Sequence, residues 1–190
     1  AYVISKRQRA GGGRVASAGG SHVRAIMSER YGGPEHLTLR DVPKPKFGDG
    51  EVLVRVIAAG LHVGDVFGMR GAPFPVRFAS GLRRPRNGVP GLDIAGVVEA
   101  VGPAVAAFAP GDEVFGLCAW PSAGGCAEYA RAPEATLARK PAGMSYVTAA
   151  ALPTSASAAL HCVRDAGGVT AGTRVLVNGA SGAVGTYALQ

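Results

Sequence analysis

The clearest chemical signal in the sequence is a set of glycines near residue 180. The stretch VLVNGASGAVG, Val175 to Gly185, places an apolar run directly before an A-x-G-x-x-G motif. In a dinucleotide-binding loop, a glycine such as Gly182 lets the backbone approach a pyrophosphate, and one such as Gly185 lets the following helix lie close to the strand. The motif predicts a cofactor loop, although an ordinary glycine-rich turn fits the local sequence equally well. The predicted loop comprises Ala180, Ser181, Gly182, Ala183, Val184 and Gly185.

The segments before this loop are the elements that would hold it. Residues 173–179, TRVLVNG, form a continuous apolar run of the kind found in strands that are buried on both faces of a parallel sheet. Residues 145–168 are rich in alanine and predict one or two helices, interrupted at Pro153 and stopped at Gly167. The sequence thus predicts the first strand of an α/β domain behind a helical link.

The preceding part of the chain predicts short strands instead. Val52, Val54 and Val56 share one face of a strand, which indicates that this face is buried. Short strands with glycine corners favour a compact β-barrel. The predicted strands cover residues 36–42, 51–60, 93–102, 111–117 and 124–132.

Charge and cysteine content exclude several classes of protein. The net charge of +7 suggests nucleic-acid binding, but residues 1–24 hold five of the basic residues and no acid, so the remainder is nearly neutral. No apolar run is long enough to cross a bilayer or to act as a secretory signal. The 3 cysteines form no paired framework and favour a reducing compartment, so we expect a cytoplasmic protein without nucleic-acid or membrane partners.

Residues 1–22 differ in composition from the rest. They are rich in Gly, Ser and Arg and show no apolar period, so we expect no packed structure there. A transit peptide has a similar composition, but this segment lacks an initiating Met and a clear amphipathic face. We therefore interpret it as a disordered or non-native extension, either translated upstream sequence or a cloning remnant.

Seven motifs follow one another along residues 23–190: YGGPEHLTLRDVPKP, GEVLVRVIAAGLHVGD, PGLDIAGVVEAVG, PGDEVFGL, GCAEYA, AAALPTSASAAL and GTRVLVNGASGAVG. Their order resembles the medium-chain dehydrogenase/reductase superfamily, and most of all its zinc-independent quinone oxidoreductase (zeta-crystallin-like) branch. The resemblance implies a GroES-like β-barrel catalytic domain over residues 23–145, followed by the truncated start of a Rossmann α/β domain over residues 146–190. Because Val23-Arg-Ala-Ile matches the usual start of this branch, we expect translation to begin at residue 23 and regard the chain as an N-terminal fragment.

The resemblance also implies a reaction. It indicates hydride transfer from a nicotinamide cofactor, NADPH rather than NADH, to a quinone or an α,β-unsaturated carbonyl, in a full-length protein that forms a homodimer. The alternatives are an alcohol dehydrogenase-type oxidoreductase acting on other carbonyls, and a non-enzymatic GroES-like binding module or nucleic-acid binder. The residue that selects the cofactor lies about 20 residues beyond the loop. That position falls after Gln190, and we expect the fragment alone to bind NADPH poorly and to be inactive.

A catalytic zinc ion is not expected from this comparison. Zinc-dependent relatives use three protein ligands, because zinc keeps one position open for substrate. His62 matches the first ligand position, but Leu92 stands where the second ligand, a His, is found. Residues 154–157, near the third position, contain no Cys, Asp or Glu. Cys118 and Cys126 lack the partners of a structural zinc lobe, and we interpret them as small core or loop residues.

The candidate site residues follow from the same resemblance. His62 matches an Asn that often lies near the nicotinamide, where it would donate to a developing oxyanion; the alternative is a hydrogen-bonded histidine at the barrel rim. Asp65 would orient this loop, and Asp93 would be a hydrogen-bonded structural acid. Phe67, with Met69, Phe74 and Phe78, would line a flat substrate slot or pack in the core. The basic loop at residues 83–88 is either solvated or contacts an anionic substrate.

Overall fold

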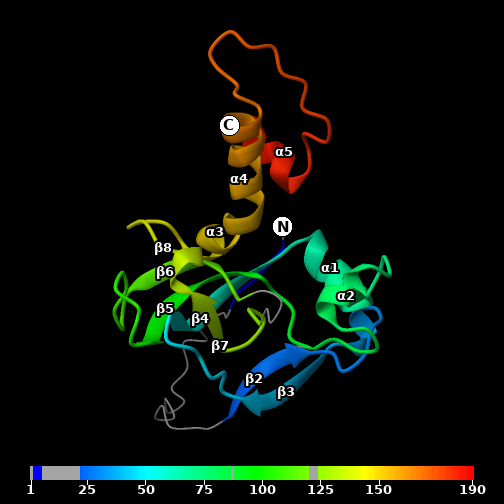
Figure 1. The fold of residues 1–190 in the computed structure, drawn as a ribbon, viewed down its shortest axis with the longest axis vertical. Coiled ribbons are helices and arrows are strands. Elements are labelled where there is room, and N and C mark those ends of the chain that lie inside the picture. Colours follow the sequence, from blue (N-terminus) through cyan, green and yellow to red (C-terminus); the bar gives the residue numbers. More distant parts are fainter. Residues whose placement is uncertain (1, 6–21, 87, 120–123) are drawn as a thin grey trace.

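The computed structural model describes residues 2–5, 22–86, 88–119 and 124–190. A strongly curved antiparallel sheet forms the body, and a helical arm rises from it (Figure 1). The sheet order is β1 (Tyr2–Ser5), β4 (Glu51–Leu61), β5 (Asp93–Val101), β6 (Glu113–Leu117) and β8 (Leu137–Arg139), and β7 (Tyr129–Pro133) pairs with β4. A separate two-stranded sheet consists of β2 (His22–Met27) and β3 (Thr38–Pro43).

The sheet curls into a small barrel. The first half of β4 pairs with β7, and its full length pairs with β5 on the other edge. Beyond β6, the Ala119 N–H donates to the Arg131 carbonyl in β7 at 3.2 Å, which joins the two ends of the curved sheet. β2 attaches through the Ile26 N–H, which donates to the Cys126 carbonyl at 2.9 Å. The predicted compact β-barrel is therefore confirmed.

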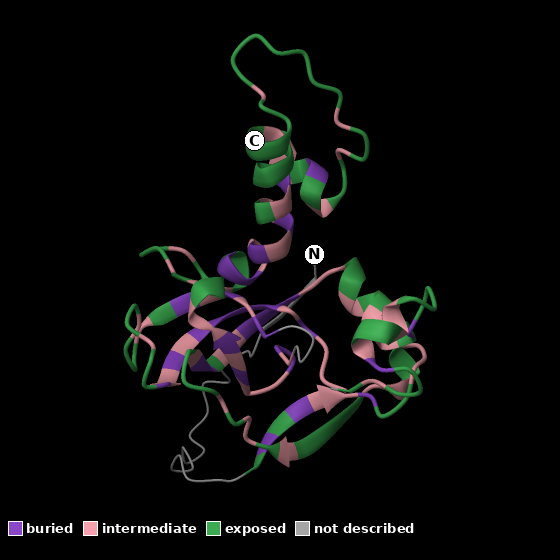
Figure 2. Cartoon of the chain, viewed as in Figure 1, coloured by how far each residue is buried: buried purple, intermediate pink, exposed green. Residues whose placement is uncertain are grey.

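The barrel core follows from the alternation of side chains along its strands. Val52 and Val54 of β4 are fully buried, as are Ile94 of β5 and Val114 of β6. These residues form one cluster with Val98, Cys118, Ala130 and Ala132. Figure 2 shows that buried positions recur along the strands of the body. Each buried CH₂ group contributes about 0.8 kcal/mol, so small aliphatic residues at alternate positions suffice to hold the barrel closed.

Two short helices lie beside the barrel in a segment where only strands and turns were expected. They are α1 (Val63–Arg70) and α2 (Val76–Ser80). α1 begins with a capping box made by His62 and Asp65 instead of the usual Ser or Thr with Glu. The two helices have 8 and 5 residues and bury none, so neither is long enough to give a clear apolar period in the sequence. The expectation of an all-strand barrel segment was wrong here for that reason.

The helical arm agrees with the sequence. It contains α3 (Tyr146–Ala150), α4 (Pro153–Leu160) and a π-helical turn η3 (His161–Ala166), and Gly167 follows as the C-cap. The Ser145 hydroxyl accepts a hydrogen bond from the Thr148 N–H at 3.0 Å and caps α3. The predicted interruption at Pro153 and stop at Gly167 are confirmed. The remaining short elements are α5 (Ala183–Ala188) and the 3₁₀ turns η1 (Pro34–His36) and η2 (Glu134–Thr136).

The predicted strand over residues 173–179 is not formed. The structure assigns no strand there, and Val175 and Leu176 are 53% and 94% exposed. A parallel strand exists only when neighbouring strands pair its N–H and C=O groups and cover its two faces. Within the described residues no strand lies beside this segment, so its apolar side chains remain in solvent.

The expectation of no packed structure in residues 1–22 was wrong for the parts that the structure describes. Residues 2–5 form β1, which pairs with β4 in the register Tyr2 with Leu61 to Ser5 with Ala58, and His22 begins β2. The sequence Tyr-Val-Ile is rich in strand-forming types, and the end of β4 offers an edge that β7 leaves unpaired. Residues 1 and 6–21 lie outside the described residues.

The three cysteines differ in their access to solvent, which gives a first testable prediction. Cys118 and Cys126 are buried, and burial raises the pKa of each thiol to about 12, whereas Cys162 is exposed. Only the thiolate reacts, so we expect a disulfide reagent such as Ellman's reagent to label one thiol per native chain and all three after denaturation. Rapid labelling of Cys118 or Cys126 in the native protein would contradict this packing.

In the part of the chain that the structure describes, no helix has the length and apolar character needed to cross a membrane.

Candidate functional site

Two cavities meet at the end of β4. The first has a volume of about 280 Å³ and lies between the link that joins β2 to β3, α1 and the segment that follows α2. The second, of about 940 Å³, lies between the start of α1, α4 and the glycine loop. His62 lines both cavities, because it follows β4 directly and caps α1. This junction is the candidate site.

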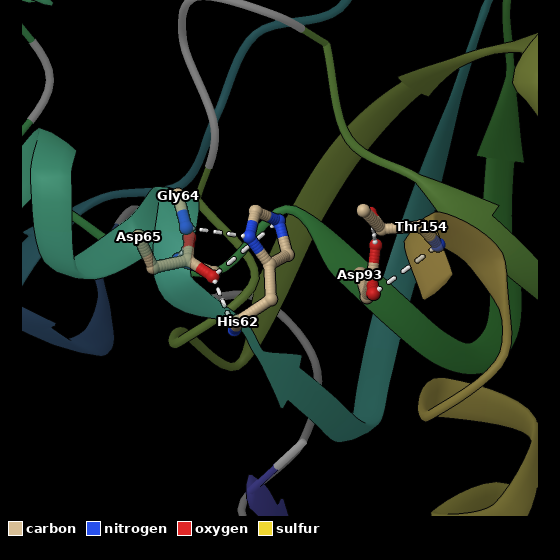
Figure 3. Close-up of polar contacts among 6 residues, drawn as sticks. His62, Gly64, Asp65, Asp93 and Thr154 are labelled. Atoms are coloured by element: carbon tan, nitrogen blue, oxygen red, sulfur yellow. Dashed lines mark hydrogen bonds and ion pairs between the residues drawn. The ribbon is translucent and has the colours of Figure 1, made fainter. Parts of the chain in front are cut away.

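The hydrogen bonds of His62 fix its tautomer. The Gly64 N–H donates to Nδ1 at 2.9 Å, so this nitrogen cannot carry a hydrogen in the neutral ring and Nε2 must. Nε2 is buried and has no hydrogen-bond partner among the described residues, and Oδ2 of Asp65 is 3.6 Å away, beyond hydrogen-bonding distance. In Figure 3 the ring lies between α1 and the pair formed by Asp93 and Thr154. A buried donor left unpaired costs about 1–3 kcal/mol, which a ligand oxygen at this point would recover.

Asp65 holds the corner that carries His62. Its Oδ2 accepts the His62 backbone N–H at 2.9 Å, and its Oδ1 accepts the Gly91 N–H at 3.0 Å. The carboxylate therefore ties the start of α1 to the loop before β5. With both oxygens engaged by the backbone, Asp65 is suited to position His62 and not to exchange protons with a ligand.

Asp93 links the barrel to the helical arm. It is 3% exposed in β5, and it accepts hydrogen bonds from the Thr154 hydroxyl and, at 3.4 Å, from the Thr154 N–H at the start of α4 (Figure 3). Burial raises the pKa of Asp93, and the bonds from Thr154 offset part of that rise. Next to it, Gly60 lets β4 approach α3 closely, since a Cβ there would come within 2.3 Å of the Ala150 carbonyl oxygen.

The raised pKa of Asp93 gives a prediction about stability. The native state holds the proton of Asp93 more tightly than the unfolded state, in which the pKa is near 3.8. The protonated acid therefore contributes to the free energy of unfolding below pH 3.8, and this contribution is lost as the pH rises through the native pKa. Asp93→Asn cannot ionise. We therefore expect its melting temperature, relative to the parent protein, to be more favourable at pH 7 than at pH 3. Parallel melting curves for the two proteins across this range would contradict the assignment.

The glycine loop forms a tight turn with a closely packed helix after it, although the strand expected before it is not formed. The Gly182 N–H donates to the Gly179 carbonyl at 2.9 Å, and Gly179 adopts a left-handed φ of 77°. A Cβ on Gly185 would come within 2.3 Å of the Gly179 oxygen, so α5 packs too closely on the turn for a side chain. A Cβ on Gly182 would come within 3.3 Å of the same oxygen, which is also a tight contact. These features, together with the larger cavity beside the loop, fit a bound nucleotide cofactor.

The expected aromatic slot is only partly formed. Met69 lines the first cavity, but Phe67, Phe74 and Phe78 are 43%, 59% and 65% exposed and line neither cavity. Phe74 and Phe78 instead contact each other edge to face, with ring centroids 5.8 Å apart. The apolar lining that the sequence did not reveal consists of Leu37, Pro85, Val89, Pro90 and Leu92. Leu37 comes from a distant segment, and the other four lie within residues 85–92, where Pro90 and Leu92 belong to the motif PGLDIAGVVEAVG.

The described residues do not suit a metal ion. They contain no group of three or more His, Cys, Asp or Glu side chains that could hold one. Leu92 lines the same cavity as His62 and offers no donor, and Nδ1 of His62 is already engaged by Gly64. A catalytic zinc needs three protein ligands, and this corner supplies one free ring nitrogen.

Comparison with known proteins matches residues 48–142 to a family model described as the alcohol dehydrogenase GroES-like domain. A quinone oxidoreductase from Lama guanicoe is 38% identical over 170 residues, which cover 88% of this chain and 48% of the relative. The solved quinone oxidoreductase from Coxiella burnetii is 31% identical with a TM-score of 0.75, covering 88% of this chain and 52% of that one. A mycobacterial protein solved in complex with NADPH is 29% identical with a TM-score of 0.72, covering 87% and 48%. The chain spans about half the length of the curated relatives it matches.

Proposed function

The chain belongs to the alcohol dehydrogenase GroES-like domain family, and we propose that the protein is an NAD(P)H-dependent oxidoreductase that reduces a quinone or an α,β-unsaturated carbonyl without zinc. The observation that carries this proposal is the unpaired Nε2–H of His62 at the junction of the two cavities. The cavity beside the glycine loop would receive the cofactor, and the apolar cavity would receive the substrate. Quinone oxidoreductases among the relatives support the substrate class.

The chemistry assigns a role to each residue of the site. When bound, a reduced nicotinamide supplies a hydride, which is two electrons and one proton. On an enone the hydride would form a C–H bond at the β-carbon, the C=C π electrons would move to the carbonyl oxygen, and a proton from solvent would complete the saturated ketone. On a quinone the same hydride and one solvent proton would give the hydroquinone. His62 would donate Nε2–H to the oxygen that becomes negative, and Asp65 would hold His62 in place.

NADPH is the proposed cofactor, ahead of NADH. The solved relative with bound NADPH supports this choice, and the geometry of Gly182 and Gly185 supports a pyrophosphate at residues 180–185. We further propose residues 23–145 as the catalytic domain and 146–190 as the start of the nucleotide-binding domain. A cytoplasmic homodimer that takes small-molecule substrates agrees with the unpaired cysteines and with the resemblance described above.

The proposal is tested by NADPH oxidation at 340 nm with the full-length gene product and a panel of quinones, enones and simple aldehydes. We expect turnover with quinones or enones. Turnover restricted to aldehydes, or NADP⁺ reduction by simple alcohols, would favour the alcohol dehydrogenase alternative. If no compound in the panel were reduced, the substrate assignment would fail.

Metal removal gives a separate prediction. Among the described residues of this corner, Nε2 of His62 is one potential metal ligand, and a catalytic zinc needs three. We therefore expect dialysis against EDTA and 1,10-phenanthroline to leave the rate of quinone or enone reduction unchanged. A zinc-dependent alcohol dehydrogenase treated in parallel serves as the positive control for metal removal. Loss of activity that added zinc restores would show that this protein uses a metal after all.

A further inference from the structure

An unusual concentration of arginine lies in the chain segment that also supplies one wall of the smaller cavity. Residues 70–86 contain five arginines and no acidic residue. Arg83, Arg84 and Arg86 are exposed, and the arginine ion pairs in the described part of the chain involve other residues, namely Arg24, Arg40, Arg131, Arg139 and Arg164. We call Arg83, Arg84 and Arg86 the arginine turn. Without acidic neighbours in sequence, this turn carries a concentrated positive charge.

Hydrogen bonds hold the arginine turn against the end of α2 and the link between β2 and β3. The Arg86 N–H donates to the Ser80 carbonyl at 2.8 Å, and the Tyr31 hydroxyl contacts the Ser80 hydroxyl at 2.9 Å and donates to the Gly81 carbonyl. Gly81 has a φ of 122° and is too close to Arg84 for a side chain. An anchored turn loses little backbone freedom when it binds a ligand, which favours recognition.

The same segment forms one wall of the smaller cavity. Ser80, Pro85, Gly88, Val89 and Pro90 all line it, so the arginines are sequence neighbours of lining residues. The arginine turn is therefore next in the chain to this wall, on a different segment from His62, and Arg86 lines a further cavity together with Gly88 and Val89.

The other polar groups of this cavity are already engaged. The Ser28 hydroxyl donates to the Arg30 carbonyl at 2.6 Å, the Ser80 hydroxyl donates to the Val76 carbonyl at 3.0 Å, and the Asp65 oxygens accept backbone N–H groups. Among the lining side chains described, His62 retains an unused donor. The carboxylates of Asp65 and Asp93 lie near that donor. A neutral carbonyl oxygen of the substrate can therefore accept the bond from His62, whereas an anionic group at this point would be repelled.

We propose that the substrate carries an anionic group, such as a sulfonate, phosphate or carboxylate, which the arginine turn binds while its carbonyl faces His62. Guanidinium groups form strong charge-assisted bonds to such groups. The apolar part of the substrate would lie against Leu37, Val89 and Leu92. This inference rests on the proposed function for the reaction, but its binding component is measurable without turnover.

The test compares two quinones with the same ring, 1,4-naphthoquinone and 1,4-naphthoquinone-2-sulfonate, as substrates of the full-length gene product. The triple variant Arg83→Gln/Arg84→Gln/Arg86→Gln is compared with a charge-matched control, Arg55→Gln/Arg139→Gln/Arg164→Gln, in other exposed parts of the chain. The ratio of kcat/KM for the sulfonate to that for the neutral quinone removes most effects on folding. We expect this ratio to fall by about tenfold in the arginine-turn variant and to stay constant in the control.

The outcomes separate this inference from the proposed function. A ratio that is unchanged in the arginine-turn variant, or that falls equally in the control, would overturn the inference while the reductase assignment stands. If neither quinone is turned over, the wider panel of quinones and enones decides the reductase assignment, and calorimetric titration with the sulfonate decides the inference. Binding that weakens about tenfold in the arginine-turn variant, and not in the control, supports it; equal binding by all three proteins refutes it.

Discussion

Replacing His62 by alanine is expected to lower kcat for quinone or enone reduction by about 100- to 1000-fold, the usual effect of removing one donor to a developing oxyanion. The expectation rests on geometry, because Gly64 fixes the tautomer and leaves Nε2–H as an unused donor on a residue that lines both cavities. KM should change less than kcat, since the oxygen becomes fully negative only during the reaction. Steady-state kinetics of NADPH oxidation measure both quantities.

The matched control for this experiment is His62→Asn. Asparagine is a good N-cap. Its side-chain oxygen can accept the Gly64 N–H as Nδ1 of His62 does, and its NH₂ group can donate as Nε2–H does. Alanine also loses the helix cap, worth about 0.5–2 kcal/mol, so thermal unfolding of both variants separates stability from catalysis. We expect the asparagine variant to retain much more activity than the alanine variant. An alanine variant with unchanged kcat would remove His62 from the mechanism.

The second large effect is expected at Gly185. The Cβ of a valine at this position would lie 2.3 Å from the Gly179 carbonyl oxygen, which is too close for two non-bonded atoms. The turn and α5 would therefore have to move apart. Each lost hydrogen bond to a charged phosphate costs about 1.5–3 kcal/mol, so we expect the Kd for NADPH to rise about 10- to 100-fold or more. Fluorescence titration of the full-length gene product with NADPH measures this change.

Gly50→Ala is a suitable control for the loop variant. A Cβ on Gly50 would meet nothing within 4 Å, so this substitution should leave both folding and NADPH affinity unchanged. The Gly185→Val variant should retain the barrel, because the loop lies outside the barrel core. NADPH affinity equal to that of the parent protein in the Gly185→Val variant would show that residues 180–185 are an ordinary turn.

Much of the barrel was predictable because its strands alternate and end in turns. β4, β5 and the interruption of the helical arm at Pro153 lie where the sequence places them. α1 and α2 escaped prediction because they bury no residue and one of them is capped by a histidine. The apolar run at residues 173–179 gave a misleading signal, since a buried strand depends on partners that a local pattern cannot supply. β1 was missed for the related reason that its partner edge is formed by a distant strand.

The candidate site was predictable only in part. Sequence resemblance pointed to His62 and Asp65, because both directly follow a recognisable strand. The free Nε2–H could not be foreseen, since it depends on the local cap made by the Gly64 N–H. The hydrogen bond between Asp93 and Thr154 joins residues far apart in the chain. The segment that includes Ser80 and Pro90 lines the same cavity as His62 only after folding. Phe67 lies on the short helix α1, is 43% exposed and lines neither of the two cavities, which its residue type alone could not indicate.

The most direct test of the account is the fate of deuterium from NADPH labelled at C4. The full-length gene product is incubated with an enone and, separately, with each of the two C4-deuterated forms of the cofactor, and the products are analysed by NMR. We predict that one of the two forms delivers deuterium to the β-carbon of the saturated ketone, as hydride transfer between the two cavities at His62 requires. A reduced product without deuterium from either form, or no oxidation of NADPH, would contradict the account.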